Sequence, residues 1–241
     1  MSGAGFFDLP SDLQNSYLGL VGVHLEEALI PVAIGLAVAL PLGQLCARFS
    51  WLYAPVLWVT TVLYAIPSLA FFVFLIDYTG ATRTTVMIPL TVYSLVLLLP
   101  AIVDGVRSVP QETMSAATAM GFGPVQRYLK VQLPIAVPAI IAGLRVAVAS
   151  SISLVSVGAL IGNQGALGNL LQDAILYHRT NLAVNSVVTT AALAVLLDVA
   201  LVLLRMALTP WMPRGERAAR RASRAAAVEP AARPTLEDAV S

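Results

Sequence analysis

Charged side chains are scarce in this sequence of 241 residues. Only 11% of the residues are charged and 58% are hydrophobic, whereas a soluble globular domain carries about 25% charged residues. So few charges cannot cover a surface that faces water. The composition therefore excludes an ordinary soluble domain and predicts that a lipid bilayer surrounds most of the chain.

Cysteine, histidine and lysine are nearly absent. The single cysteine, Cys46, excludes an internal disulfide and a cysteine-based metal site. His24 and His178 lie far apart in the sequence with no carboxylate cluster beside them, so no metal site is expected. The only lysine, Lys130, follows Leu129, and the Gly-Lys-Ser/Thr sequence of a phosphate-binding P-loop is missing. The chain is therefore not expected to bind a nucleotide itself.

Long apolar runs are what the sequence does contain. A membrane-spanning helix needs about 20 mostly apolar residues, and five segments meet or nearly meet this length. They are residues 28–47, 54–76, 86–103, 135–161 and 183–208. Prolines inside or at the ends of these runs predict kinks. The sequence therefore predicts an all-α membrane protein with about five transmembrane helices, of which the short third one needs flanking residues to complete its span.

The distribution of basic residues predicts the orientation of these spans, because cytoplasmic loops are enriched in Lys and Arg. Five spans place the two termini on opposite sides. If the C-terminus is cytoplasmic, the outer side holds only Arg83 and Arg179. The inner side then holds Arg48, Arg107, Arg127, Lys130, Arg214, Arg217, Arg220, Arg221 and Arg224. We therefore expect the N-terminus outside and the C-terminus in the cytoplasm.

Three parts are expected along the chain. Residues 1–20 form an external segment that lacks a basic region and so does not resemble a cleavable signal peptide. Residues 21–210 form the membrane domain. Residues 211–241 form a cytoplasmic tail, predicted to be disordered because it is rich in Ala, Arg and Pro and has almost no large apolar residues. We expect the tail to act as a basic anchor at the inner leaflet, with a regulatory role as the alternative.

A polar island at 108–134 interrupts the apolar runs. Ser108 is expected as the N-cap of a helix with Gln111 at the capping-box position. The helix should end at Gly121, which can take the positive φ of a C-terminal turn. A second helix start at Pro124 leads into the fourth run. The island is thus predicted to form a helix-turn-helix elbow at the membrane face, with alanines that let a soluble partner approach closely.

The elbow resembles the cytoplasmic signature of importer-type ABC permeases, which reads E-A-A, three residues, Gly, nine residues, then I-x-L-P. This chain has Ser115-Ala116-Ala117, three residues, Gly121, nine residues, then Val131-Gln132-Leu133-Pro134. Ser115 replaces the glutamate of the signature, and Glu112, one turn earlier, could substitute for it. The resemblance implies a coupling helix that sits in a groove of a separate ATPase subunit. The ATPase-coupling residues that it implies are Glu112, Ser115, Ala116, Ala117, Gly121, Leu133 and Pro134.

Further stretches resemble the osmoprotectant branch, whose permeases import glycine betaine, choline, carnitine and related quaternary amines. They are YAIPSLAFFVFLI at 64–76, VPAIIAGLRVAV at 137–148, ALIGNQGALGNLL at 159–171 and ALAVLLDVAL at 192–201. The family usually has GAGGLG where this chain has GNQGALG.

The resemblance spans about residues 20–208 and implies a multi-pass permease of the bacterial plasma membrane. It also implies three protein partners: an ABC ATPase that holds ATP and Mg²⁺, a second permease copy or paralogue, and an extracytoplasmic solute-binding protein. The bilayer is the only other partner expected, and nucleic acid is not.

Two charges and four uncharged residues stand out within the spans. Arg145 and Asp198 lie at similar depths in the fourth and fifth runs, so a structural ion pair is expected, with a role in solute passage or gating as the alternative. A quaternary ammonium has no N–H donor and binds to aromatic faces. Residues that could line its path are Tyr64, Pro67, Ser68 and Tyr93, although packing is the alternative role for each tyrosine.

Other polar residues received structural assignments. Glu26 and Glu27 are expected at the outer interface. The outer loop, with residues Asn163 to Asn169 and Asp173, is a candidate docking surface for a solute-binding protein, with an ordinary solvated loop as the alternative. Serines at 150, 151, 153 and 156 are expected to permit close helix packing, with a water-filled pathway as the second choice.

Three rival functions remain from the sequence. An ion-coupled secondary transporter usually needs carboxylates or broken helices at mid-membrane, and Asp198 is the only acidic residue well inside a run. An intramembrane enzyme needs a convergent catalytic set, which the sequence does not display. A permease of the same architecture for methionine or another amino acid is disfavoured only by the resemblance to the osmoprotectant branch.

Overall fold

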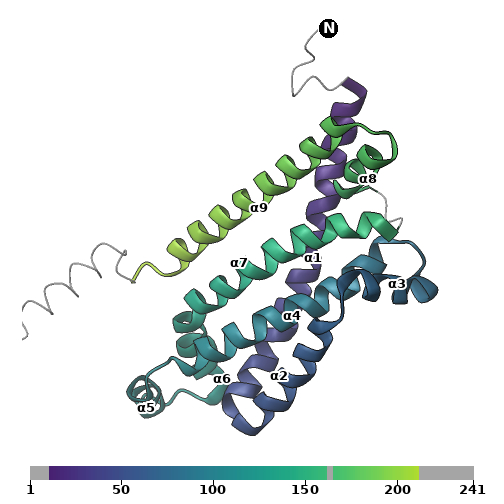
Figure 1. The fold of residues 1–241 in the computed structure, drawn as a ribbon. Helices are drawn as coiled ribbons and strands as arrows, with labels where there is room; N and C mark the ends of the chain where they lie inside the picture. Colours follow the sequence, from purple (N-terminus) through teal and green to yellow (C-terminus); the bar gives the residue numbers. More distant parts are fainter. Residues whose placement is uncertain (1–10, 162–164, 212–241) are drawn as a thin grey trace, which may run out of the picture.

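The described part of the chain is a bundle of helices (Figure 1). The structure is a computed structural model that describes residues 11–161 and 165–211, with side chains from residue 17 onward. In chain order the helices are α1 (Ser11–Arg48), α2 (Ser50–Ala65), α3 (Ser68–Thr79), α4 (Arg83–Arg107), α5 (Gln111–Ala119), α6 (Pro124–Arg127), the π-helix η1 (Tyr128–Gln132), α7 (Leu133–Gly158), the 3₁₀ turn η2 (Ala159–Ile161), α8 (Gly168–Leu176) and α9 (Thr180–Leu208). The described ranges contain no strand, so the predicted all-α class is confirmed.

Four helical stretches are long and apolar enough to cross a membrane, by length and composition. They are Tyr17–Arg48, Arg83–Arg107, Pro124–Ile161 and Thr180–Leu208. The third predicted span is thus completed by flanking residues. The predicted tail at 211–241 lies outside the described residues except for its first residue, and Asn163 lies in the undescribed gap.

The second predicted span is broken at Pro67, one of the prolines at which a kink was predicted. The helices α2 and α3 make a fifth candidate crossing only as a pair that bends by 87°. The cause lies at Pro67, which has no N–H to continue α2 and forces the preceding residue out of the helical region. Ile66 accordingly has an extended backbone, with φ −67° and ψ 123°. Elsewhere Pro31, Pro89 and Pro138 lie inside unbroken helices.

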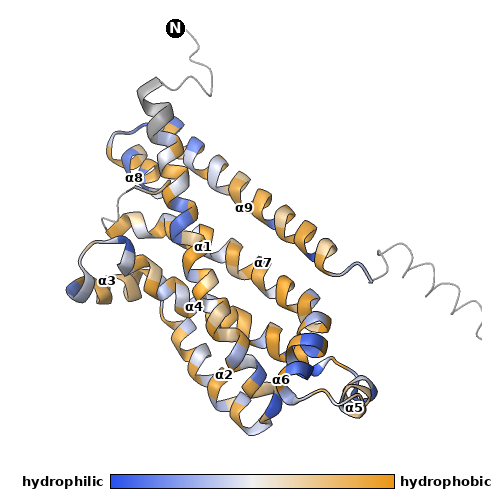
Figure 2. Cartoon of the chain, turned by 180° about the vertical axis from the view of Figure 1, so that it is seen from behind, coloured by the Kyte–Doolittle hydropathy of each residue, from blue (hydrophilic) through white to orange (hydrophobic). Residues whose placement is uncertain are grey.

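The elements gather at two ends of the bundle. Figure 1 places α5, α6 and the turn from α1 to α2 at one end, and α3, α8 and the start of α1 at the other. Coloured by hydropathy, the lengths of α2, α7 and α9 are mostly hydrophobic, and many of the hydrophilic residues lie at the two ends (Figure 2). This alternation is what a chain that crosses an apolar layer repeatedly requires.

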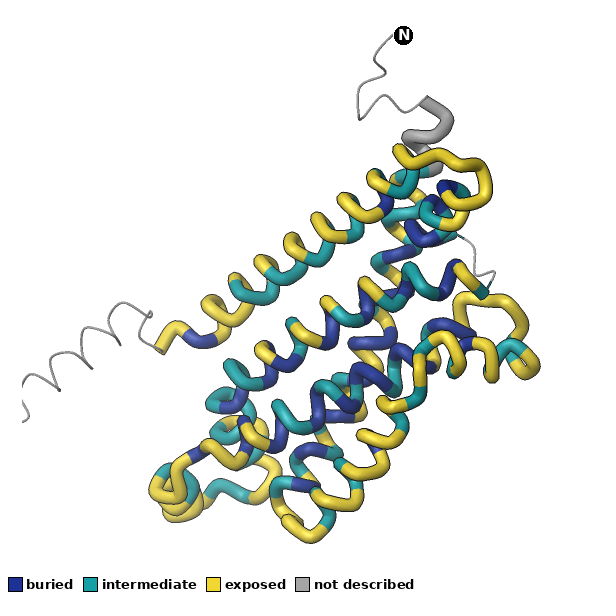
Figure 3. Tube along the Cα trace, viewed as in Figure 1, coloured by how far each residue is buried: buried dark blue, intermediate teal, exposed yellow. Residues whose placement is uncertain are grey.

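The core lies where α4 packs between α1 and α7. Figure 3 shows buried residues along the facing sides of these helices, whereas α9 is largely exposed. The helices approach closely because small residues stand at the crossings. A Cβ atom built at Gly143 of α7 would lie 2.5 Å from the Cβ of Ala101 of α4, and one at Gly35 of α1 would overlap Ser94 Oγ of α4. Any larger residue at these two positions would push the helices apart.

A tyrosine of α4 forms a hydrogen bond to the backbone at the break between α2 and α3. The hydroxyl of Tyr93 in α4 donates to the Ile66 carbonyl at 2.8 Å. The Tyr93 side chain is buried, and its ring makes edge contacts with Tyr64 at 5.5 Å and with Phe71 at 6.1 Å between centroids. Because no water satisfies a free carbonyl in hydrocarbon, this hydrogen bond stabilises the bend.

The Tyr93 hydrogen bond can be tested with a matched pair of variants. Tyr93→Phe keeps the ring contacts but removes the donor to Ile66. It should lower the free energy of unfolding by about 0.6 kcal/mol, the average for interhelical hydrogen bonds in a membrane protein, and by no more than about 1.7 kcal/mol. Tyr64→Phe removes the hydroxyl of the half-exposed neighbour and should leave stability unchanged. Thermal unfolding of both variants in the same detergent measures the difference. Equal stability of the two variants would contradict the assignment.

Candidate functional site

The first half of the elbow ends in a Schellman turn at the predicted glycine. Gly121 has φ +83°, the left-handed conformation that favours glycine. Its N–H bonds the Thr118 carbonyl at 3.0 Å, and the Phe122 N–H bonds the Ala117 carbonyl at 3.1 Å. These are the two bonds that define the motif and satisfy the last carbonyls of α5. The signature glycine is therefore required by the backbone itself.

The predicted N-cap at Ser108 is wrong. Ser108 is instead the C-cap of α4: its N–H bonds the Asp104 carbonyl at 2.9 Å, and its hydroxyl bonds the Gly105 carbonyl at 2.7 Å. Pro110 takes the N-cap position of α5 without a side-chain hydrogen bond, and the helix begins at Gln111. The reason is that α4 runs one turn farther than its apolar residues indicate.

The second half of the elbow leads into α7 without a break. The helix α6 begins at Pro124 as predicted, where the Gln126 side chain accepts from the Gly123 N–H at 3.3 Å. The π-helix η1 follows, and α7 starts at Leu133 with Pro134 in its first turn. The Tyr128 hydroxyl donates to the Leu40 carbonyl of α1 at 3.1 Å. The elbow is thus held to α1 and is continuous with a spanning helix.

Helix α5 presents most of its surface outward. The Ala117 side chain is buried, whereas Glu112, Ser115 and Ala116 are exposed. Arg127 Nη1 donates to Thr118 Oγ1 at 2.7 Å and holds α5 against α6. Of the two signature alanines, one therefore packs inside the elbow and the other lies on its outer surface. The small side chain of Ala116, flanked by polar groups, leaves room for another protein to lie close to the helix backbone.

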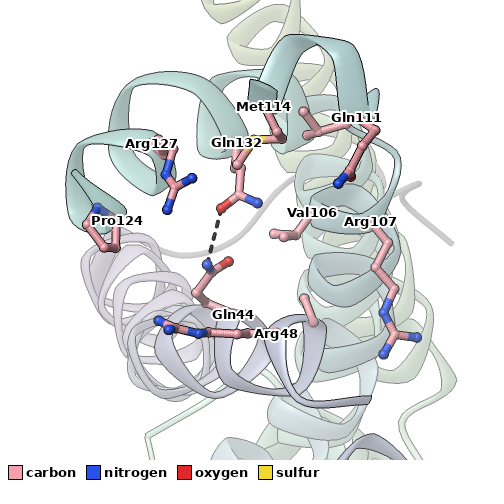
Figure 4. A pocket seen from close by; sticks show the side chains of 11 residues that line it. Gln44, Arg48, Val106, Arg107, Gln111, Met114, Pro124, Arg127 and Gln132 are labelled. Carbon is pink, nitrogen blue, oxygen red and sulfur yellow. Dashed lines mark hydrogen bonds between the residues drawn. The ribbon is translucent and has the colours of Figure 1, made fainter. Parts of the chain in front are cut away.

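A pocket of about 460 Å³ separates the elbow from the ends of α1 and α4. Figure 4 shows Arg127 on the elbow side and Arg48 on the α1 side of this pocket. Between them, Gln44 Nε2 donates to Gln132 Oε1 at 3.1 Å. The pocket was not predicted, because it forms where the end of α1 packs against the end of α4 and the elbow, about 60 residues later in the chain.

The structure brings Arg145 of α7 together with Asp198 of α9. Arg145 Nε lies 2.5 Å from Asp198 Oδ1, and Nη2 lies 2.8 Å from Oδ2, which is a bidentate pair. The two side chains are 38% and 40% exposed on the surface of this chain. A charge that faces hydrocarbon is costly, so this exposure favours a pair that faces water or another protein chain.

The four candidate path residues gather at the α2–α3 break. Pro67 and Ser68 begin α3, and the Tyr64 and Tyr93 rings meet edge to face at an interplanar angle of 80°. Tyr93 is buried and its hydroxyl is engaged, whereas Tyr64 is 46% exposed. Of the two tyrosines, only Tyr64 therefore keeps an accessible ring.

The serines of α7 divide between packing and a second cavity. The Ser151 hydroxyl bonds the Ala28 carbonyl of α1 at 2.8 Å, which is a packing role. Ser153 and Ser156 line a cavity of about 350 Å³ between α7 and α9, together with Thr190 and Ser186 of α9. The lining of this cavity is mostly apolar, and these four hydroxyl groups are its polar part.

Glu26 and Glu27, expected at the outer interface, both lie beside Arg83 at the start of α4, where Glu26 is exposed and Glu27 is buried. The Glu27 side chain is buried, and its Oε1 lies 3.5 Å from Arg83 Nε at the start of α4. His24, one turn earlier, is also buried, with Nε2 3.0 Å from the Ile152 carbonyl of α7. A single-sequence pattern cannot reveal these contacts, because the partners lie on other helices. No cluster of metal ligands occurs among the residues described.

Reversal of the two intramembrane charges tests their pairing. Arg145→Asp places two carboxylates together and Asp198→Arg places two guanidinium groups together, so each single variant should lower the yield of folded protein and its melting temperature. The double reversal restores opposite charges and should recover both. The measurement is fluorescence-detected size-exclusion chromatography with a thermal ramp. A double variant no better than the singles would refute a direct interaction.

Two glycines of the elbow provide a test of the Schellman turn. Gly121 has a positive φ and Gly123 has φ −66°, and a Cβ at either position meets no atom within 4 Å. Gly121→Ala should therefore destabilise the turn by about 1–2 kcal/mol, the cost of left-handed backbone for an L-residue. Gly123→Ala should have little effect. Hydrogen exchange of the Gly121 and Phe122 amide region reports the difference, and similar exchange in both variants would contradict this account.

Comparison with known proteins agrees with this geometry. The family described as "Binding-protein-dependent transport system inner membrane component" matches residues 39–214. The glycine betaine/carnitine/choline transport system permease protein OpuCD of Bacillus subtilis is 31% identical over 188 residues, which cover 78% of this chain and 82% of the relative. The osmoprotectant import permease protein OsmW of Salmonella typhimurium is 32% identical over 189 residues, covering 76% and 87%.

A solved structure shares the fold. The inward-facing MetNI methionine ABC transporter in its CY5 native crystal form matches with a TM-score of 0.72 at 20% identity, covering 83% of this chain and all of that chain. Because the family match spans most of the sequence and extends from α1 through the elbow to α9, the chain belongs to the binding-protein-dependent transport system inner membrane components, the permease subunits of ABC importers.

Proposed function

We propose that this permease imports quaternary-ammonium compatible solutes such as glycine betaine, choline or carnitine. The observation that carries the proposal is the agreement among relatives. The choline transport system permease OpuBB of Bacillus subtilis, 27% identical, and the carnitine transport permease OpuCB of Listeria monocytogenes, 30% identical, each match over 78% of this chain. The likeness to the methionine transporter is one of fold alone, so it does not favour an amino-acid substrate.

The chemistry of the α2–α3 break supports this substrate class. A quaternary ammonium offers no hydrogen-bond donor, and its positive charge is attracted to the faces of aromatic rings. Tyr64, Phe71 and Tyr93 cluster at the break, and Tyr64 is half-exposed there. We assign this cluster, with Pro67 and Ser68, to the translocation path.

The elbow is the proposed coupling segment for a separate ATPase. Its exposed helix α5 carries Glu112, Ser115 and Ala116 outward, while Gly121 fixes the turn and Leu133 and Pro134 join the elbow to α7. ATP and Mg²⁺ would reside on that ATPase. An extracytoplasmic solute-binding protein would deliver the solute to the opposite end of the bundle, where α3 and α8 lie (Figure 1).

A cytoplasmic elbow is consistent with the charges of the described residues. Arg48, Arg107, Arg127 and Lys130 belong to the elbow end, and Arg83 and Arg179 to the other end. Basic residues concentrate on the cytoplasmic side of membrane proteins, so we place the elbow and the C-terminus inside and the N-terminus outside.

A second permease copy or paralogue would complete the pathway. Five crossings in one chain are too few to enclose a path with alternating access. The half-exposed Arg145–Asp198 pair and the exposed surface of α9 are consistent with a neighbouring protein chain on that side.

Uptake by the assembled complex tests the proposal. The chain is co-expressed with its ATPase and second permease, and the complex is reconstituted into liposomes with the solute-binding protein. Radiolabelled glycine betaine or choline should be transported only when ATP is present on the side of the membrane that the ATPase faces. Excess unlabelled carnitine should compete and excess methionine should not. ATP-dependent uptake of methionine without uptake of any quaternary amine would refute the substrate class.

A bulky residue on the elbow tests the coupling role in the same preparation. Ala116→Trp adds a large side chain to the exposed face of α5 and should abolish both co-purification of the ATPase and uptake. Gln172→Trp adds the same bulk to exposed α8 at the other end and should leave ATPase binding intact. Loss of ATPase binding in both variants, or in neither, would contradict the coupling assignment.

A further inference from the structure

The pocket behind the elbow is strongly basic. Three arginines and three glutamines contribute to its lining, which contains no Asp or Glu. They are Arg48 and Gln44 of α1, Arg107 of α4, Gln111 of α5, Arg127 of α6 and Gln132 of η1. Like charges gathered at one site repel each other, so an anion bound among them would be stabilised.

None of these arginines has a carboxylate partner within the part of the chain that the structure describes. Arg107 donates to the Cys46 carbonyl at 3.1 Å and lies 4.9 Å from the centre of the Tyr53 ring. Arg48 lies 5.5 Å from the centre of the Phe49 ring. The contacts of Arg107 and Arg48 are thus with a carbonyl dipole and with aromatic rings.

Two buried polar atoms at the pocket have no hydrogen-bond partner. They are Arg127 Nε and Gln44 Oε1. An unsatisfied donor on a guanidinium group is costly when buried. Arg127 uses Nη1 to bond Thr118, and so its remaining N–H groups can donate to a ligand in the pocket.

Figure 4 shows how the donors are arranged. Arg127 extends from the elbow and Arg48 from α1 toward the same side of the Gln44–Gln132 pair, and Arg107 lies at the opposite edge. Two guanidinium groups that approach from different elements can each present paired N–H donors to the oxygens of one tetrahedral anion. Arg107, already bonded to Cys46, contributes charge.

We propose that this pocket binds the phosphate group of an anionic ligand between Arg48 and Arg127, and that the ligand is a membrane phospholipid headgroup. The position favours a lipid source over free phosphate. Arg48 and Arg107 lie in the last turns of two spanning helices. Beside Arg48, Phe49 is 42% exposed and Trp51 75% exposed, and aromatic residues of this kind occupy the headgroup level of membranes. Basic pockets between helices at that level bind anionic headgroups.

The bound phosphate would link two elements that the pocket otherwise separates. Arg48 belongs to the bundle and Arg127 to the elbow, so one shared anion would hold the elbow at a fixed distance from α1. The site is separate from the aromatic cluster at the α2–α3 break and does not depend on which solute is carried.

Lipid retention by the full-length chain tests the site. The protein is placed in nanodiscs that contain equal amounts of phosphatidylglycerol and phosphatidylcholine, and the lipids that remain bound are counted by native mass spectrometry. The wild type should retain phosphatidylglycerol selectively. The double variant Arg48→Gln/Arg127→Gln should lower its apparent affinity about tenfold or more, as expected when charge-assisted hydrogen bonds are lost. The control Arg179→Gln/Arg205→Gln removes the same charge from exposed positions elsewhere and should retain the lipid.

A second arm separates the two sources of phosphate. Inorganic phosphate is added to protein in nanodiscs of phosphatidylcholine alone, against chloride at equal ionic strength. Thermal stabilisation by phosphate that the double variant loses, without selective retention of phosphatidylglycerol, would replace the lipid by free phosphate and overturn the lipid source.

Should the double variant not fold, Arg48→Gln alone serves, because the Arg48 side chain is exposed and lies over the Phe49 ring. Retention and stabilisation equal to those of the control variant would overturn the proposal altogether. Neither result touches the uptake assay, so the solute proposal stands or fails separately.

Discussion

The hydrocarbon of a bilayer offers no hydrogen-bond partner to a backbone carbonyl, and the arrangement of these helices follows from this constraint. Side chains of neighbouring helices supply partners at several points: Ser94 bonds the Pro31 carbonyl, Ser151 bonds that of Ala28 and Tyr93 bonds that of Ile66. Each of these bonds joins two helices at one place. The same contacts that satisfy the backbone therefore also determine which helices pack together.

Among the prolines within the described spans, the constraint explains why Pro67 alone produces a sharp break. Pro31, Pro89 and Pro138 are accommodated within helices that continue on both sides. At Pro67 the chain bends by 87° because a buried tyrosine from α4 is positioned to bond the carbonyl released at Ile66. A proline in the sequence predicts a possible kink, but the partner that stabilises a break comes from another helix. For this reason the sequence predicted a kink at Pro67 but not the sharp break of 87° that divides the second apolar run.

Local signals predicted the elbow well, and long-range contacts were missed. The positive φ of Gly121 and the helix start at Pro124 follow from residue types and spacing within a few positions. The burial of Glu27 depends on Arg83, which a separate helix brings to within 3.5 Å. The three arginines of the basic pocket were counted only as markers of orientation. Their convergence depends on how the ends of α1 and α4 and the elbow pack, which periodicity does not reveal.

The Arg145–Asp198 pair was predicted although it is a long-range contact, because both residues are visible in the sequence as charges within apolar runs. Depth along each helix, at about 1.5 Å per residue, was enough to bring Arg145 and Asp198 to the same level. What depth could not give is the direction of the pair, which lies half-exposed on the α7–α9 seam. Counting residues along a helix predicts how deep a side chain lies in the membrane. The direction in which that side chain points around the helix axis depends on how the helices pack.

The route by which elbow motion reaches the rest of the bundle follows from these contacts. From Pro124 to Ile161 the chain is helical without interruption, through α6, the π-helix, α7 and η2. Helices resist bending far more than loops, so a displacement of the elbow is carried along α7, and the wider π-helical turn at Tyr128–Gln132 is the place where a change of direction costs least. In the proposed coupling, the Arg145–Asp198 pair would pass this displacement on to α9. The bond from Tyr128 to α1 at the same turn would make α1 the fixed point for that movement.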